Sequence, residues 1–165
     1  MNEIYAKILG NHAADVIKRT SDLTPTGITV TGQLSAPPEC ELAVRIDFRG
    51  RLSNDSAIDG YVLCGSVRHD QSRPLLAAMA RHFGLDESLA DSPQGAADIL
   101  SEFLNIIIGL TGADWCEHGF EMDFSTPENI SGRVPAKFAE AGQAFHIVVT
   151  TEDGANVDLV AVFGG

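Results

Sequence analysis

The sequence has few cysteines and no segment that marks secretion or membrane anchoring. Its three cysteines, Cys40, Cys64 and Cys116, lie far apart without a CxxC pair, and the N-terminus has neither a basic segment nor a long apolar run. The longest strongly apolar stretch, Phe103 to Leu110, includes Asn105 and is shorter than the roughly 20 residues that cross a bilayer. We therefore expect a cytosolic protein without a membrane span, which needs no disulfides to fold.

Basic side chains are scarce and unevenly distributed. The chain has 11 Lys and Arg against 23 Asp and Glu, for a net charge of −12, so nonspecific binding to nucleic-acid phosphates is disfavoured. Leu85 to Gly132 contains no Lys or Arg but ten acidic residues: Asp86, Glu87, Asp91, Asp98, Glu102, Asp114, Glu117, Glu121, Asp123 and Glu128. We interpret this segment either as a solvated acidic face or as a docking surface for a protein with an exposed basic residue. In both cases a phosphorylated small molecule would be repelled.

Motifs for several common kinds of catalytic site are also missing. The sequence has no glycine-rich phosphate loop and no serine nucleophile elbow. Cys116 and His118 are separated by one residue, but no second pair completes a zinc site. His12 and His82 lie in predicted helices without a supporting pattern, which favours surface or packing histidines over phosphotransfer. We expect no metal ion and no cofactor of the chain's own.

Composition and periodicity predict one domain over residues 1–165. The contents of 44% hydrophobic and 21% charged residues are close to the globular average, and the length fits a single core. Apolar residues recur at helical spacing in some segments and alternate with polar residues in others, most clearly from Cys40 to Arg49. We predict helices at 2–18, 71–84 and 93–111, and strands at 28–34, 40–49, 58–67, 118–124, 143–151 and 156–163. The predicted fold class is α+β, an antiparallel or mixed β-sheet with amphipathic helices packed on it.

The helix at 93–111 is apolar around most of its circumference, which indicates burial by neighbours on several sides. Ser92 is a favoured N-cap and Pro93 a favoured first helical residue. Four residues break the apolar pattern at spacings of four, three and four, which places them on one narrow stripe: Asp98, Glu102, Asn105 and Gly109. Such a stripe can be the ordinary solvent-exposed face of a helix that packs on a sheet. However, Asn is a poor helix former and Gly costs about 1 kcal/mol relative to Ala, so both residues favour a functional reason.

A Glu and an Asn one helical turn apart limit the chemistry that the stripe could perform. An amide is neither a base nor a nucleophile near neutral pH, but it can hold a water molecule in a fixed orientation through hydrogen bonds. An exposed Glu stays ionised and can pair with a cation. This combination suits a site that orients water for attack on an already activated group, so that catalysis comes from positioning rather than from acid–base work.

The stripe resembles the motif of the CheC/CheX/FliY phosphatases of bacterial chemotaxis, most closely that of CheX. Their motif is an Asp or Ser, three residues, a Glu, two residues, an Asn, and a Pro 22 positions beyond the Asn. The matching residues here are Asp98, Glu102, Asn105 and Pro127. The continuation Asn-Ile-Ile-x-Gly, ending at Gly109, is also similar to the family. This sequence has one Glu-x-x-Asn, as in the single-site CheX type, and departs from the family at Phe103-Leu104, where small residues are more common.

The resemblance implies hydrolysis of the phospho-aspartate of a CheY-like response regulator in two-component signalling. The resemblance implies that Asn105 orients the attacking water and that Glu102 contacts the receiver's active-site lysine. It also implies that Asp98, Gly109 and Pro127 are supporting residues. The receiver would supply Mg²⁺. Family analogy also suggests a homodimer. The alternative is a noncatalytic adaptor or flagellar-switch-like binding module of the same fold, which would have no reason to retain both Glu102 and Asn105.

Overall fold

The computed structural model describes residues 2–32, 34, 39–132 and 143–164. Its α-helices are α1 (Asn2–Ser21), α2 (His69–His82) and α3 (Pro93–Glu117), and a short 3₁₀ helix, η1 (Glu87–Asp91), precedes α3. The strands are β1 (Pro25–Gly32), β2 (Leu42–Leu52), β3 (Ala57–Ser66), β4 (Phe120–Phe124), β5 (Glu128–Asn129), β6 (Gln143–Thr151) and β7 (Asn156–Phe163).

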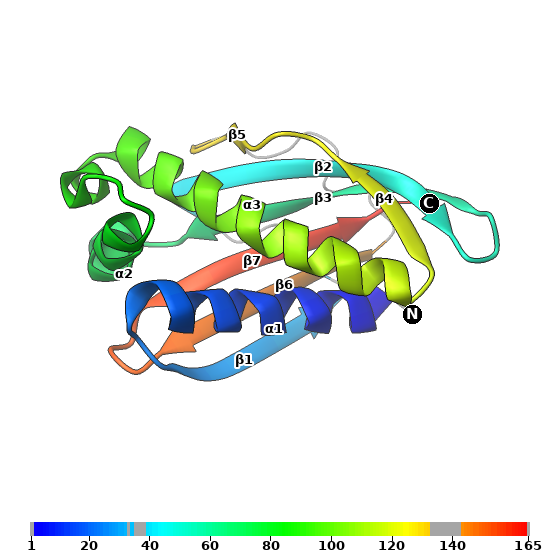
Figure 1. Cartoon of the computed structure of the whole chain (residues 1–165), viewed down its shortest axis with the longest axis horizontal. Helices are drawn as coiled ribbons and strands as arrows, with labels where there is room; N and C mark the ends of the chain where they lie inside the picture. Colours follow the sequence, from blue (N-terminus) through cyan, green and yellow to red (C-terminus); the bar gives the residue numbers. More distant parts are fainter. Residues whose placement is uncertain (1, 33, 35–38, 133–142, 165) are drawn as a thin grey trace.

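In the described residues, seven strands form one antiparallel sheet: six follow the order β1-β6-β7-β3-β2-β4, and β5 also pairs with β2 (Figure 1). The β2/β3 and β6/β7 pairs are hairpins, in which Val44 faces Cys64 and Ile147 faces Leu159. At the outer edge of β2, β4 pairs with the second half of the strand and β5 with its first half. The predicted α+β class is confirmed, and the sheet, predicted as antiparallel or mixed, is antiparallel.

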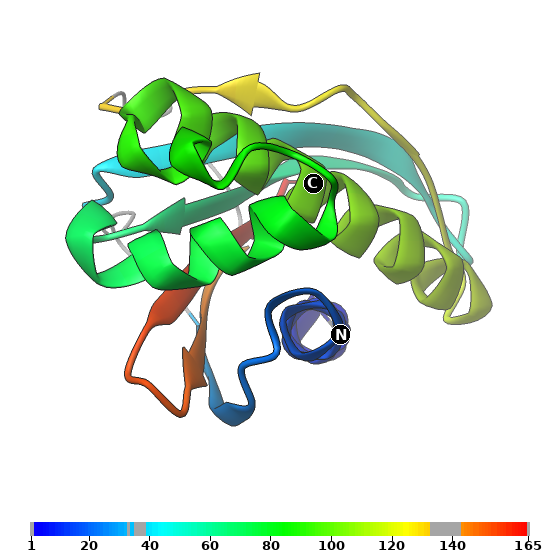
Figure 2. The same ribbon diagram turned by 60° about the vertical axis from the view of Figure 1, so that its left-hand side comes forward.

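All three α-helices lie on one face of the sheet, as Figures 1 and 2 show. α1 contacts β1 and β6, whereas α3 contacts β2, β4 and β5 and also packs against α1. Trp115 is fully buried where α3 meets α1, and its Nε1 donates to the Tyr5 carbonyl oxygen at 3.1 Å. Its ring packs within an aromatic cluster that includes Phe48 and Phe120. Trp115 is therefore a packing residue that joins α3 to α1.

Element boundaries differ from the predictions mainly where packing overrides local propensity. α3 was predicted to end at Thr111 but continues for six more residues, to Glu117. It does so although Thr111 and Gly112 are weak helix formers. The reason is tertiary: Thr111 and Trp115 are fully buried, and a side chain at Gly112 would meet the ring of Phe124 at 2.9 Å. β2 likewise continues to Leu52 instead of ending at 49. The predicted strand at 28–34 lies within Pro25–Gly32 for its first five residues, and residue 33 is outside the described ranges.

The full length of α3 bears on the expectation that the chain has no membrane span. The run from Phe103 to Leu110 is too short to cross a bilayer, but the 25-residue helix is long and apolar enough to do so by composition alone. Its fully buried residues, such as Ile99, Phe103 and Ile107, belong to the core under the sheet. The packing of the domain therefore accounts for the apolar character of α3.

Candidate functional site

The four residues of the predicted stripe, Asp98, Glu102, Asn105 and Gly109, all lie on the exposed face of α3. Most of the residues between them are buried. Phe103 and Leu104, which depart from the family pattern, are fully buried in the core. The two larger side chains therefore change the packing beneath the helix and leave its outer surface unaltered.

The start of α3 is held by side-chain capping and by close packing. The Gly95 N–H donates to the Ser92 Oγ at 3.0 Å, which confirms Ser92 as the N-cap, and Pro93 occupies the first turn. Gly95 itself packs against η1, where an added Cβ would lie 2.3 Å from the Leu89 carbonyl oxygen. The stripe is thus carried by a helix that is anchored at its beginning and buried along one side.

The side chains of Glu102 and Asn105 have no hydrogen bond or ion pair with any other residue that the structure describes. Both side chains are exposed, and they project from adjacent turns of the same helix face. An unpaired carboxylate and an unpaired amide at this spacing are available to a partner without first breaking an internal contact. The geometry therefore permits one charged and one neutral polar contact from a single rigid element.

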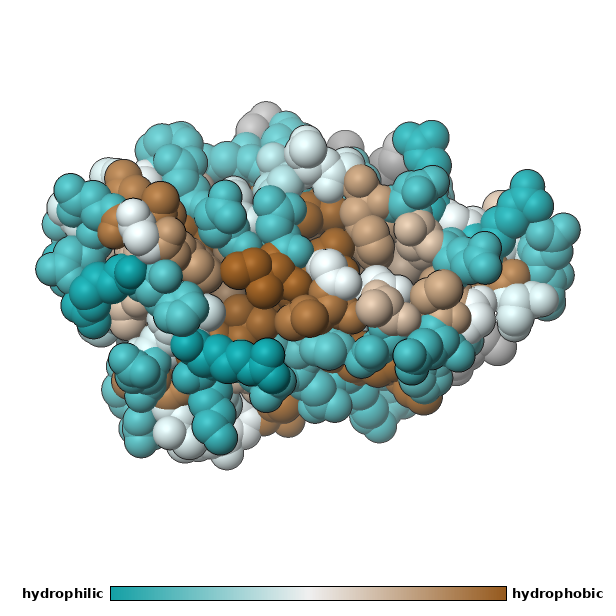
Figure 3. Space-filling view, in the orientation of Figure 1, coloured by the Kyte–Doolittle hydropathy of each residue, from teal (hydrophilic) through white to brown (hydrophobic). Residues whose placement is uncertain are grey.

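An apolar surface borders the stripe on the side towards α1. Ile106 and Leu110 remain 38% and 37% exposed, one turn apart, and Figure 3 shows an apolar patch near the middle of α3. Neither residue was singled out from the sequence, because the apolar run of the helix does not distinguish buried from exposed positions. We call Ile106 and Leu110 the apolar margin of the stripe. Together with the Glu102 carboxylate and the Asn105 amide, this margin is suited to contact with a protein partner.

A chain segment from Ser125 to Ser131 borders the opposite side and contains Pro127. Two backbone hydrogen bonds attach this segment to β2. The Ser125 N–H donates to the Asp47 carbonyl oxygen at 2.9 Å, and the Ile130 N–H donates to the Ala43 carbonyl oxygen at 2.9 Å. Pro127 is half-buried between these attachments. The fold thus brings this segment, distant in sequence from Asp98, to the same side of the molecule as the start of α3.

Part of the acidic surface predicted for Leu85 to Gly132 is neutralised by other elements. Arg73 and Arg81 of α2 form ion pairs with Asp91 and Glu87, respectively. His12 of α1 contacts Asp114 of α3, with 2.7 Å between Nε2 and Oδ2. These contacts could not be read from the sequence, because the partner side chains come from other helices. Glu102 stands apart from these paired acids.

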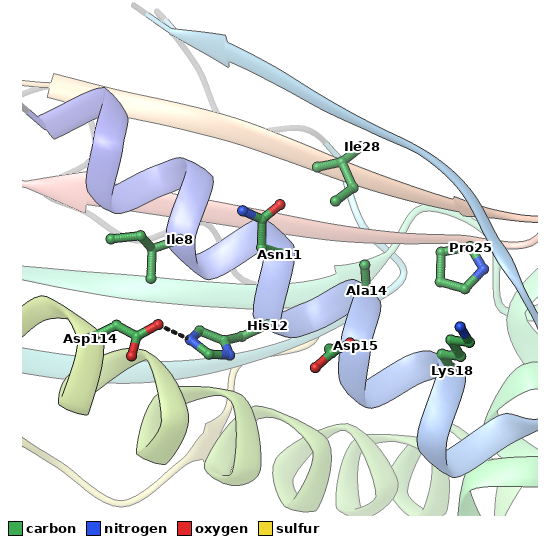
Figure 4. A pocket seen from close by; sticks show the side chains of 9 residues that line it. All are labelled: Ile8, Asn11, His12, Ala14, Asp15, Lys18, Pro25, Ile28 and Asp114. Carbon is green, nitrogen blue, oxygen red and sulfur yellow. Dashed lines mark hydrogen bonds and ion pairs between the residues drawn. The ribbon is translucent and has the colours of Figure 1, made fainter.

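A separate hollow of about 440 Å³ lies around the exposed side of α1 (Figure 4). Its lining includes the His12–Asp114 pair, Asp15, which pairs with Arg19, and the apolar Ile28. His12 therefore joins two helices, in agreement with its interpretation as a surface or packing residue. Across the described ranges, no group of three or more His, Cys, Asp or Glu side chains is arranged to hold a metal ion.

Gly109 is not required by packing in the part of the chain that the structure describes, where an added Cβ would meet nothing within 4 Å. We expect Gly109→Ala to raise the free energy of unfolding by about 0.5–1 kcal/mol, since Ala restricts the unfolded chain and favours the helix. Urea denaturation would measure this change. Gly95→Ala is the matched control in the same helix and should destabilise, because of the 2.3 Å approach to Leu89. A loss of stability in Gly109→Ala would contradict the open surface.

No protein-family model matches the sequence, and no curated protein matches it at a significant level. Solved structures do match. A CheC-like superfamily protein from Shewanella sp. PV-4 has a TM-score of 0.73 at 17% identity, with 100% of both chains covered. A chain of the CheX–CheY–BeF3–Mg²⁺ complex from Borrelia burgdorferi has a TM-score of 0.71 at 14% identity, with 98% of both chains covered.

The flagellar protein FliM has a related fold at lower similarity. The FliM middle domain from H. pylori gives a TM-score of 0.55 at 6% identity, with 93% of this chain and 84% of that chain covered. The higher TM-scores and fuller coverage of the chemotaxis proteins agree with the resemblance of the helix motif. The fold of this chain is that of the CheC/CheX-like chemotaxis proteins.

Proposed function

We propose that the chain is a phosphatase that removes phosphate from the phospho-aspartate of a CheY-like receiver domain. The observation that carries the proposal is that Glu102 and Asn105, at the motif spacing on α3, are exposed and have no side-chain partner among the described residues. The fold adds support, because it is shared with a chain of a complex that contains CheX, CheY, BeF3 and Mg²⁺. The proposed setting is the bacterial cytosol, where the chain would act in two-component signalling.

In the proposed reaction, this chain supplies positioning and the receiver supplies the activated phosphoryl group. The Asn105 amide holds a water molecule in line with the phosphorus, and the bond to the aspartyl oxygen breaks as the water attacks, which yields inorganic phosphate and the free carboxylate. Glu102 pairs with a lysine of the receiver and sets the register of docking. Mg²⁺ would be held by the receiver and would neutralise charge on the phosphoryl oxygens.

The alternative function is a noncatalytic adaptor of the same fold. The FliM middle domain is a structural neighbour, and a second neighbour is a chain of the FliG–FliM complex from H. pylori. An adaptor would use the apolar margin at Ile106 and Leu110 for docking but would not require an unpaired amide beside it. The two functions therefore differ in catalysis, and both predict binding.

A decay assay with a phosphorylated CheY-like receiver separates the two functions. The receiver is phosphorylated with a small phosphodonor, the donor is removed, and the remaining phosphoprotein is followed with and without the chain. The phosphatase proposal predicts faster decay in proportion to the amount of chain added at subsaturating concentration. Binding without faster decay would support the adaptor. Light scattering on the same samples would test the proposed homodimer.

A further inference from the structure

A continuous series of side-chain hydrogen bonds runs from the edge of the sheet to the stripe. Asn129 Nδ2 donates to Gln94 Oε1 at 3.3 Å, and Gln94 Nε2 donates to Asp98 Oδ1 at 3.1 Å. At its other end, Asn129 Oδ1 accepts from the Ser131 backbone N–H at 3.0 Å and from the Ser131 hydroxyl at 2.7 Å. The Ser131 Oγ in turn accepts from the Ala43 N–H at 3.2 Å, which ties the series to β2.

The direction of every bond in this series is set by its two ends. A backbone N–H can only donate, so Ser131 requires the oxygen of the Asn129 amide on its side and turns the Nδ2 towards Gln94. Gln94 must then accept with its oxygen and present its nitrogen to Asp98, whose ionised carboxylate can only accept. Donors and acceptors match at each step, so the arrangement selects one orientation of both amides.

The stripe carries two carboxylates, and only one of them belongs to this series of hydrogen bonds. Asp98 and Glu102 lie four residues apart, about 6 Å along the helix axis, and both are exposed. Gln94 engages the Asp98 carboxylate, whereas Glu102 has no partner among the described residues. A cation on a docking protein therefore meets one engaged carboxylate and one free carboxylate.

We propose that Gln94, oriented by Asn129, is a positioning residue that restrains the Asp98 carboxylate through Oδ1, so that Glu102, which has no side-chain partner among the described residues, is the preferred acceptor for the receiver's lysine. This inference rests on the proposed docking function. A lysine captured by Asp98 would place the receiver one helical turn out of register, with its phosphoryl group displaced from Asn105. Displacements of even 1 Å impair positioning catalysis, so such a complex would bind without reacting.

Gln94→Ala frees Asp98 and creates this unreactive mode of binding. If the freed carboxylate competes on equal terms, half of the complexes are unreactive, so kcat and KM both fall about twofold while kcat/KM is unchanged. In an Asp98→Asn background, Gln94→Ala should leave both constants unchanged relative to Asp98→Asn alone, because the competing charge is already removed. A merely structural defect would lower kcat/KM and would not be rescued by Asp98→Asn. Unchanged kcat and KM in Gln94→Ala would overturn the inference.

A binding experiment tests the same inference without catalysis, with a CheY-like receiver loaded with beryllofluoride and Mg²⁺ as the probe. Glu102→Ala should weaken binding about tenfold, and Gln94→Ala/Glu102→Ala should recover much of that loss through the freed Asp98. Adding Asp98→Asn to the double variant should abolish the recovery. Absence of recovery, or absence of any binding by the wild-type chain, would overturn the inference, whereas binding and recovery without faster phosphate loss would overturn only the phosphatase function.

Discussion

Replacing Asn105 with Ala is expected to lower the added rate of receiver dephosphorylation roughly 100-fold, which corresponds to about 2.7 kcal/mol of transition-state free energy. In the proposed reaction the amide orients the attacking water, and the Ala side chain has no group that can donate or accept a hydrogen bond. Binding of the receiver should change little, because Glu102 and the apolar margin are retained. The decay assay gives the rate, and titration with the beryllofluoride-loaded receiver gives the affinity.

Loss of folding cannot explain such a result. The Asn105 side chain is exposed and has no partner among the described residues, and Ala is the better helix former, so the free energy of unfolding should stay equal or rise. Asn11→Ala is a matched control, since Asn11 is also an exposed asparagine in a helix, α1. The control should retain the wild-type rate. If Asn105→Ala dephosphorylated the receiver as fast as the wild type, the proposed role of the amide would be wrong.

Reversing the charge of Glu102 should have the largest effect on docking. Glu102→Lys places a cation against the receiver's lysine, and we expect affinity to fall roughly 100-fold at low ionic strength, because opposed like charges at an interface cost several kcal/mol. The difference from the wild type should shrink as salt is raised, since exposed charges are screened. Titration of the receiver at two ionic strengths would measure both effects.

Glu121→Lys makes the same change in net charge on the other face of the sheet. Phe120 is fully buried on the helix side of β4, so the alternation of the strand directs Glu121 to the opposite side. This control should keep the affinity of the wild type within about twofold, because long-range electrostatic effects are screened. Equal weakening by Glu102→Lys and Glu121→Lys would indicate a general effect of charge and would contradict specific anchoring by Glu102.

Short-range patterns in the sequence were sufficient for the main elements of the fold and for the stripe. The alternation of β2, the apolar spacing of α1 and the Ser92-Pro93 start of α3 are local signals, because the periods of helices and strands decide which residues share a face. The same periodicity places Asp98, Glu102, Asn105 and Gly109 together. No knowledge of the rest of the molecule was needed to predict this face.

The surroundings of the stripe depended on contacts between segments distant in sequence. Ile106 and Leu110 belong to the same apolar run as the buried Ile107 and Ile108, and only the position of neighbouring elements leaves the first pair exposed. The end of α3 was also misplaced, because the buried Trp115 keeps the helix intact beyond Gly112. Such differences in burial arise from tertiary packing and leave no periodic signal.

Contacts between distant segments also determine which acidic side chains on the stripe have hydrogen-bond partners. Gln94 and Asp98 are one turn apart, but their hydrogen bond is oriented by Asn129, which arrives through the pairing of β5 with β2. Local periodicity could therefore predict which carboxylates share the exposed face of α3. Which carboxylate is engaged and which is free required the tertiary structure, because hydrogen-bond partners come from wherever the chain folds back.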